Sequence, residues 1–346
     1  MTPLEFEQSI GSVVPKRNKH DCFFHPPGSI VLPVRTPLGE SSVSDLILHH
    51  FDASPYAEKA RLMLGIKNLA WSSVQIPMIM PKPDLVALTG GYRKTPVLQI
   101  GADVYCDTSC IARELERRHP EPTLFPDGGA GLAIALAAWG DRYFEPGAAL
   151  AMTVNDDLPA DLLRDRREFF THMDFAAMKS RVPQLYAQLL AHTALVDEQL
   201  ADGRDYLQGL RPGLADITAY FVISMVRGFL AEAANLLARF GRLQEWEMRM
   251  RAIGHGRPVA LDSAQALEVA RRSRPAPVRG VDPSDGMGLQ AGARVTVTPD
   301  DYGKVPVTGE LVTLDLHEVA VRREDERAGE VVVHFPRIGY DAVPHR

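Results

Sequence analysis

The sequence predicts three structural parts: an α/β domain, an all-α helical domain, and a small all-β domain at the C-terminal end. Two changes in the apolar pattern support this division. Strand-like and helix-like segments alternate up to residue 127, and helical spacing then runs from 130 to 270. After residue 284 the apolar residues recur with a period of two. The 346 residues are enough for such an arrangement.

Residues 1–43 have no clear period and contain scattered prolines, which indicates a loosely ordered extension. The α/β domain is expected at 44–127. Its elements are predicted as strands at 46–51, 71–76, 97–100 and 103–105, with helices opening at residue 55 and spanning 108–119. The segment 78–91 is rich in Pro and Gly, so any helix there should be short.

The first helix has one apolar stripe, formed by Tyr56, Ala60, Met63 and Leu64 at helical spacing. Gly65 is expected to end this helix, because glycine is common at helix C-termini.

The domain at 130–270 is expected to be helical throughout. Residues 271–283 are rich in Arg, Ser and Pro and predict a linker. The remaining residues, 284–346, contain short alternating runs separated by Gly and Asp, which are typical of a small β-barrel or sandwich.

Composition excludes several classes of function. The formal net charge is -6 and the isoelectric point is about 6.0, so there is no electrostatic drive toward nucleic acid. The longest apolar runs are shorter than the roughly 20 residues that a membrane span needs. The three cysteines form neither a C-x-x-C pair nor a known metal-ligand spacing. We therefore expect a cytoplasmic protein with no metal.

The most informative pattern is a serine between a buried strand and a helix. Ser54 follows the first strand, and Pro55 occupies the first helical position. A serine here is a good helix cap in its own right, so capping alone explains its presence. However, the carboxyl end of a strand in an α/β sheet is also where ligands bind.

Four segments together resemble the cytosolic glutathione transferases, in matching order over residues 45–265. Residues 51–61 resemble the family's strand-to-helix turn, and Thr95–Leu98 resembles its Val-Pro segment. Asp107–Ser109 is similar to the family's acidic-Ser pair, and Leu214–Thr218 resembles the buried helix start of its α domain. The resemblance implies a thioredoxin-like first domain, glutathione as co-substrate, a small electrophile as second substrate, and a homodimer.

The resemblance also assigns roles to individual residues. Ser54 would face the glutathione sulfur as the catalytic residue, and Tyr56, Trp139 and Tyr143 would line the electrophile pocket. The residues implied in glutathione binding are Pro55, Lys82, Thr95, Pro96, Asp107 and Thr108. In the family the proline of the Val-Pro segment is cis, whereas an ordinary X-Pro bond is usually trans. Asp107 and Thr108 can equally be helix caps.

The chain departs from the family at two places. Gly213 stands where a Ser or Thr normally precedes Asp216 by three residues, so the reciprocal capping box should be half lost. Residues 88–93 replace the usual Asn-Pro-x-Gly, which puts contacts to the glycyl end of glutathione in doubt.

The chemistry at Ser54 can be worked out from its hydroxyl. Ser54 would stabilise a bound thiolate without being the nucleophile, and serine cannot form the mixed disulfides of a cysteine. Conjugation is therefore the first hypothesis. A glutathione-dependent isomerase, dehalogenase or lyase is one alternative, and a non-catalytic scaffold that binds a protein partner is another.

Overall fold

The computed structural model describes residues 45–127, 129–155 and 158–345. The extension predicted at 1–43 lies outside these residues. Across the described part, no helix is both long enough and apolar enough to cross a membrane.

The first domain is the expected thioredoxin-like α/β unit. Strand β1 pairs in parallel with β2 and antiparallel with β3, and β3 pairs antiparallel with β4. The elements are β1 (Ile47–His50), α2 (Pro55–Ile66), β2 (Ala70–Gln75), α3 (Pro83–Thr89), β3 (Val97–Ile100), β4 (Asp103–Cys106) and α4 (Thr108–Arg118). Helix α3 is short, as the Pro and Gly content predicts.

Gly65 does not end α2, which continues to Ile66. Its role is steric: a Cβ atom at Gly65 would lie 2.0 Å from the carbonyl oxygen of Gly254. The glycine therefore permits the close approach of two backbones, which a sequence pattern cannot distinguish from a helix end.

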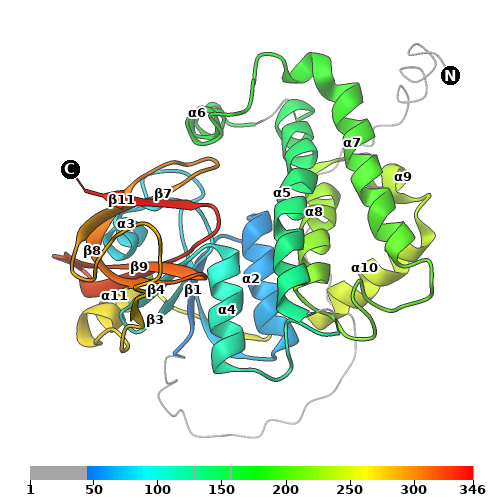
Figure 1. The fold of residues 1–346 in the computed structure, drawn as a ribbon. Helices are drawn as coiled ribbons and strands as arrows, with labels where there is room; N and C mark the ends of the chain where they lie inside the picture. The colour runs from blue at the N-terminus through cyan, green and yellow to red at the C-terminus, as the bar shows by residue number, and fades with distance from the viewer. Residues whose placement is uncertain (1–44, 128, 156–157, 346) are drawn as a thin grey trace, which may run out of the picture. The chain divides into compact units, whose positions relative to one another are not determined.

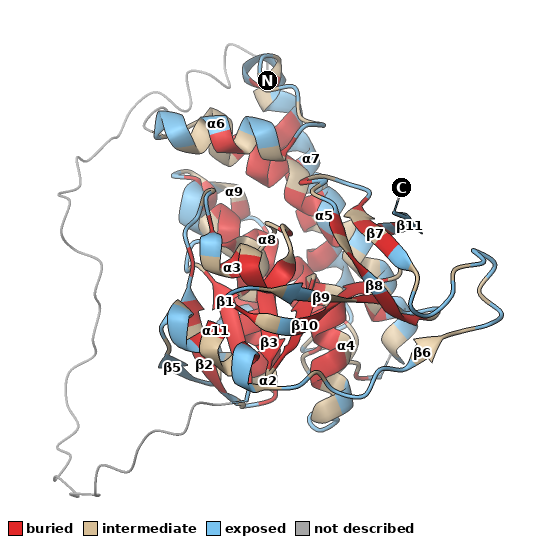
Figure 2. Cartoon of the chain, turned by 90° about the vertical axis from the view of Figure 1, so that its left-hand side faces the viewer, coloured by how far each residue is buried: buried red, intermediate tan, exposed pale blue. Residues whose placement is uncertain are grey.

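The helical domain packs against α2 through α8, and α5 packs against both α7 and α8. Figure 1 shows α5 and α8 side by side next to α2. Buried positions run through α2, α8 and the central strands (Figure 2). The helices are α5 (Gly129–Thr153), α6 (Ala160–Phe169), α7 (Met178–Gln199), α8 (Leu214–Phe229), α9 (Ala233–Leu237) and α10 (Gly241–Ile253).

The prediction that 130–270 is helical throughout is wrong at one segment. Strand β5 (Arg257–Ala260) returns to the sheet and pairs in parallel with β2. All four of its residues are exposed, so the segment has no buried face and no apolar alternation that would indicate a strand. Helix α11 (Ser263–Arg272) follows, and extends into the first two residues of the predicted linker.

The C-terminal part is strand-rich, as predicted, and it joins the sheet of the first domain. Strand β10 pairs in parallel with β4, with Val333 opposite Val104. The strand order is β11-β7-β8-β9-β10-β4-β3-β1-β2-β5, and β6 pairs with β8. The strands are β6 (Gly280–Val281), β7 (Arg294–Pro299), β8 (Val307–Leu314), β9 (Glu318–Asp325), β10 (Gly329–Pro336) and β11 (Tyr340–Pro344).

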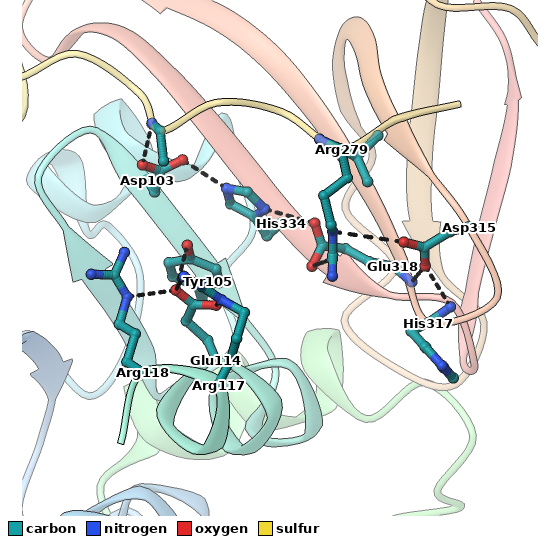
Figure 3. A network of polar contacts seen from close by, with 12 residues as sticks. Asp103, Tyr105, Glu114, Arg117, Arg118, Arg279, Asp315, His317, Glu318 and His334 are labelled. Carbon is teal, nitrogen blue, oxygen red and sulfur yellow. Dashed lines mark hydrogen bonds and ion pairs between the residues drawn. The ribbon is translucent and has the colours of Figure 1, made fainter. Parts of the chain in front are cut away.

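A polar network lies across the junction of β10 and β4 (Figure 3). The buried imidazole of His334 has Nε2 3.0 Å from Asp103 Oδ1 and Nδ1 2.9 Å from Glu318 Oε1. Its ring also stacks on Tyr105 with 4.4 Å between centroids. Burial opposes the charge on His334, but the hydrogen bonds to the two carboxylates outweigh it and raise the pKa. These two contacts connect β10 to β9 through Glu318 and to β4 through Asp103.

Candidate functional site

One cavity of about 1000 Å³ is lined by residues from all three parts of the chain. Its volume is at the upper end of the roughly 300–1,000 Å³ of small-molecule sites. Every residue predicted for catalysis or glutathione binding lines it, namely Ser54, Pro55, Lys82, Thr95, Pro96, Asp107 and Thr108. Segments far apart in the sequence are thus brought to one place.

Ser54 caps α2 at the end of the turn after β1. Its Oγ accepts a hydrogen bond from the backbone N–H of Ala57 at 3.1 Å, and its own N–H donates to Phe51 O at 3.0 Å. Within the described part of the chain, no protein acceptor is recorded for the Ser54 hydroxyl proton. Capping uses a lone pair of the oxygen, so the proton remains available to a ligand in the cavity.

The loop before β3 supplies the second group. The Thr95–Pro96 peptide bond is cis. Beside it, the Lys82 ammonium lies 3.2 Å from Thr95 Oγ1 and 3.3 Å from the carbonyl oxygen of Arg93. Burial, and then the charges of Arg166 and Arg93, lower the pKa of Lys82 to about 8. A cation is therefore held next to the cis-proline edge.

Asp107 begins α4 and adopts a positive φ of 77°. Its Oδ1 accepts from the N–H of Ser109 at 2.8 Å, so the residue is a helix cap. Its Oδ2 accepts from the hydroxyl of Tyr340, on β11, at 3.2 Å. The C-terminal strands thus contact the carboxylate that the resemblance assigns to the γ-glutamyl group.

The opposite wall belongs to α2 and α5. The Tyr56 hydroxyl donates to Asp141 Oδ1 at 2.8 Å, and both residues line the cavity. Tyr302, from the β7–β8 connection, has its hydroxyl close enough to that of Tyr56 for each to alter the other's pKa. Burial raises the pKa of both tyrosines, so both hydroxyls keep their protons at neutral pH.

Trp139 and Tyr143 lie on α5 but do not line this cavity. The indole N–H of Trp139 donates to His192 Nδ1 at 3.1 Å, and the Tyr143 hydroxyl pairs with Thr193 at 2.9 Å. Both side chains therefore face α7. Asp141 of α5 lines the cavity instead. At 3.6 residues per turn, its side chain is about 200° around the helix from that of residue 139.

Sequence reasoning missed several cavity residues. Tyr302 and Tyr340 carry no local signal, because only the tertiary fold brings the C-terminal strands to the cavity. Helix α6, which contributes Arg166 and Phe169, lies in a stretch without a strong apolar stripe. Lys59 did have a signal: it is a charged residue beside Ala60 and Met63 on the buried side of α2.

Known proteins share this architecture. A family model described as "Glutathione S-transferase, N-terminal domain" matches residues 48–123. The solved structure of a GST-like protein from Pseudomonas syringae is 38% identical, with a TM-score of 0.71, and the match covers 86% of this chain and 99% of that one. This chain belongs to the glutathione transferase superfamily. The matched 86% of this chain is longer than the part that precedes residue 270, so the matched region includes C-terminal strands.

The name of a curated relative refers to FtsZ and not to glutathione. The "FtsZ-localized protein A" of Caulobacter vibrioides is 27% identical over 228 residues, which cover 64% of this transferase-family chain and 94% of that protein. Membership in the superfamily therefore leaves the activity of the site to be argued from its geometry.

Proposed function

We propose that this chain binds glutathione in the cavity and that Ser54 stabilises its thiolate for attack on a small electrophile. The observation that carries the proposal is the Ser54 hydroxyl, which caps α2 with its oxygen and lines the cavity. A hydrogen bond donated to an anion is among the stronger ones in proteins. The N-terminus of α2 adds the positive end of a helix dipole at the same point.

The rest of the cavity suits a tripeptide. The backbone beside the cis-proline at Thr95–Pro96 would pair with the cysteinyl part as an added strand does. Asp107 and the N-terminus of α4, at Thr108, would take the γ-glutamyl ammonium and carboxylate. Lys82 would take the glycyl carboxylate.

Serine at this position favours conjugation over disulfide exchange. An isomerase, dehalogenase or lyase would use the same bound thiolate, and screening of electrophiles distinguishes these reactions. We further propose that the protein is cytoplasmic and forms a homodimer; light scattering of the purified chain tests the dimer.

A non-catalytic scaffold is the second candidate. Its support is the hydrogen bond from Tyr340 to Asp107 Oδ2, because this oxygen is one that a γ-glutamyl ammonium would contact. The name of the Caulobacter relative points the same way. A carboxylate has about four lone-pair sites, however, so the bond from Tyr340 leaves room for an ammonium.

Calorimetric titration of the full chain with glutathione separates the two candidates. A saturable heat that weakens when Asp107 is replaced by Ala supports the transferase-type site. Absence of heat over a wide range of glutathione concentrations would refute glutathione binding and favour the scaffold. Asp205→Ala, on the exposed segment between α7 and α8 and outside the cavity, is the matched control variant.

A further inference from the structure

The cavity contains a buried cation that the glutathione site does not use. Lys59, on α2, is 3% exposed and lines the cavity on the side of the helical domain. Its ammonium nitrogen lies 5.4 Å from the ring centroid of Tyr56 and 5.0 Å from that of Phe221. Both distances are in the range of cation–π contacts.

These ring contacts leave the N–H groups of Lys59 unused. Within the described residues, the ammonium has no recorded hydrogen bond and no carboxylate within ion-pair distance. Asp141 and Asp107 act on it only through longer-range charge, and burial lowers its pKa. The nitrogen is not among the fully enclosed side-chain atoms that lack a partner, so its three donors open into the cavity. A ligand anion would supply the missing partner.

The other two lysines at the cavity differ from Lys59. Lys82 hydrogen-bonds to the loop before β3, and Lys94 pairs with Asp301 at 2.5 Å. The carboxylate of Asp141 accepts a hydrogen bond from the Tyr56 hydroxyl and not from Lys59. Among the three cavity lysines, Lys59 is thus the one whose ammonium has no hydrogen bond or ion pair to the described residues.

The helices of the second domain contribute many apolar side chains to the same cavity. Those on α5, α6 and α8, with Phe170 just beyond α6, include Ile134, Phe144, Phe169, Phe170, Met225 and Phe229. A ligand that satisfies both features has an anionic group at one end and an apolar body.

We propose that Lys59 binds the anionic group of the second substrate, an amphipathic carboxylic acid whose apolar body lies against α5, α6 and α8. This inference rests on the proposed function, because it assumes that glutathione occupies the side of the cavity at Ser54. It assigns a substrate class to the remainder of the same cavity.

The test compares an acid with its neutral analogue. 4-Phenylbutyrate and 4-phenylbutan-1-ol share an apolar body, and each is titrated calorimetrically into the full chain at pH 7. We expect the acid to bind at least tenfold more tightly than the alcohol. Lys59→Met should remove this preference, Lys59→Arg should retain it, and Lys179→Met, on the exposed start of α7, should leave it unchanged.

Equal affinity of the wild-type chain for acid and alcohol would overturn the inference, and so would an acid preference that survives in Lys59→Met. The wild-type comparison decides the matter even if Lys59→Met does not fold. A separate titration with S-methylglutathione tests the proposed function. If this analogue binds while the acid shows no preference, the assignment of Lys59 fails and the glutathione site stands.

Discussion

Replacement of Ser54 by alanine should raise the pKa of bound glutathione thiol. The variant loses the hydroxyl that lines the cavity, while the positive end of α2 remains. A hydrogen bond to a charged group contributes about 1.5–3 kcal/mol. Since one pKa unit corresponds to about 1.4 kcal/mol, the thiol pKa should rise by about 1–2 units. The helix dipole, worth roughly 0.3–1 kcal/mol, should persist in the variant.

The measurement is the ultraviolet absorbance of thiolate as a function of pH, with glutathione saturating the protein. Ser54→Ala also removes the cap to Ala57 N–H, which costs about 1 kcal/mol of stability, so a control must keep the cap. Ser54→Thr retains both cap and hydroxyl and should titrate like the wild type. If Ser54→Ala binds glutathione and titrates at the wild-type pKa, the hydroxyl does not stabilise the thiolate and the reasoning fails.

Three further predictions concern charge and packing. The pKa of His334 is raised in the folded state. Its contribution to stability is therefore complete below the unfolded pKa of about 6.5 and is lost as the pH rises through the folded pKa. The free energy of unfolding of His334→Gln, measured in urea, should not show this loss, and a pH profile identical to that of the wild type would contradict the prediction. Lys82 has a pKa of about 8, so the affinity for S-methylglutathione should fall as the pH rises above 8. Lys82→Met should bind weakly with a shallower fall, because the ligand's own ammonium also loses its proton in this range. A fall as steep as that of the wild type would exclude a contribution from Lys82. Gly65→Ala should destabilise the chain by about 1–3 kcal/mol or more, because its Cβ would clash with Gly254 O. Gly228→Ala has open space at its Cβ and should stabilise the chain by about 0.5–1 kcal/mol. Thermal unfolding measures the two changes in stability, and equal shifts of the melting temperature would contradict the steric argument.

The gathering of the residues predicted to bind glutathione in one cavity could be foreseen, because these residues lie in local turns. Ser54, Thr95 and Asp107 each sit next to a strand or at a helix start, and the sequence shows these boundaries directly. Once the strand order is known, the three turns must meet at one edge of the sheet.

The cavity wall formed by the helical domain could not be predicted in the same way. Helix α5 packs against both α7 and α8, so it carries apolar residues on more than one face. An aromatic pair such as Trp139 and Tyr143 is then as compatible with the α7 interface as with a cavity. The polar residue Asp141, opposite that pair, is the better marker of the cavity face, because an acid in a helix interior needs solvent or a partner.

Gly213 shows how a departure from the family pattern can have a packing cause. The prediction of a half-retained capping box agrees with Asp216, whose Oδ2 accepts from Gly213 N–H at 3.0 Å. A Cβ at position 213 would lie 2.5 Å from Pro126 Cδ and 2.9 Å from Leu124 O. A serine would clash there, so the loss of the side-chain cap follows from the close approach of the segment that links the first two domains.

The C-terminal strands are part of the site because of where they join the sheet. The strand beside β10 is β4, which leads directly into Asp107, and the hydroxyl of Tyr340 reaches that carboxylate from β11. One apolar cluster includes Val104 of β4 together with Val331 and Phe335 of β10. A strand without its neighbour would expose unpaired backbone and this apolar surface. If Asp107 binds glutathione as proposed, we expect that binding to be coupled to the folding of the C-terminal strands.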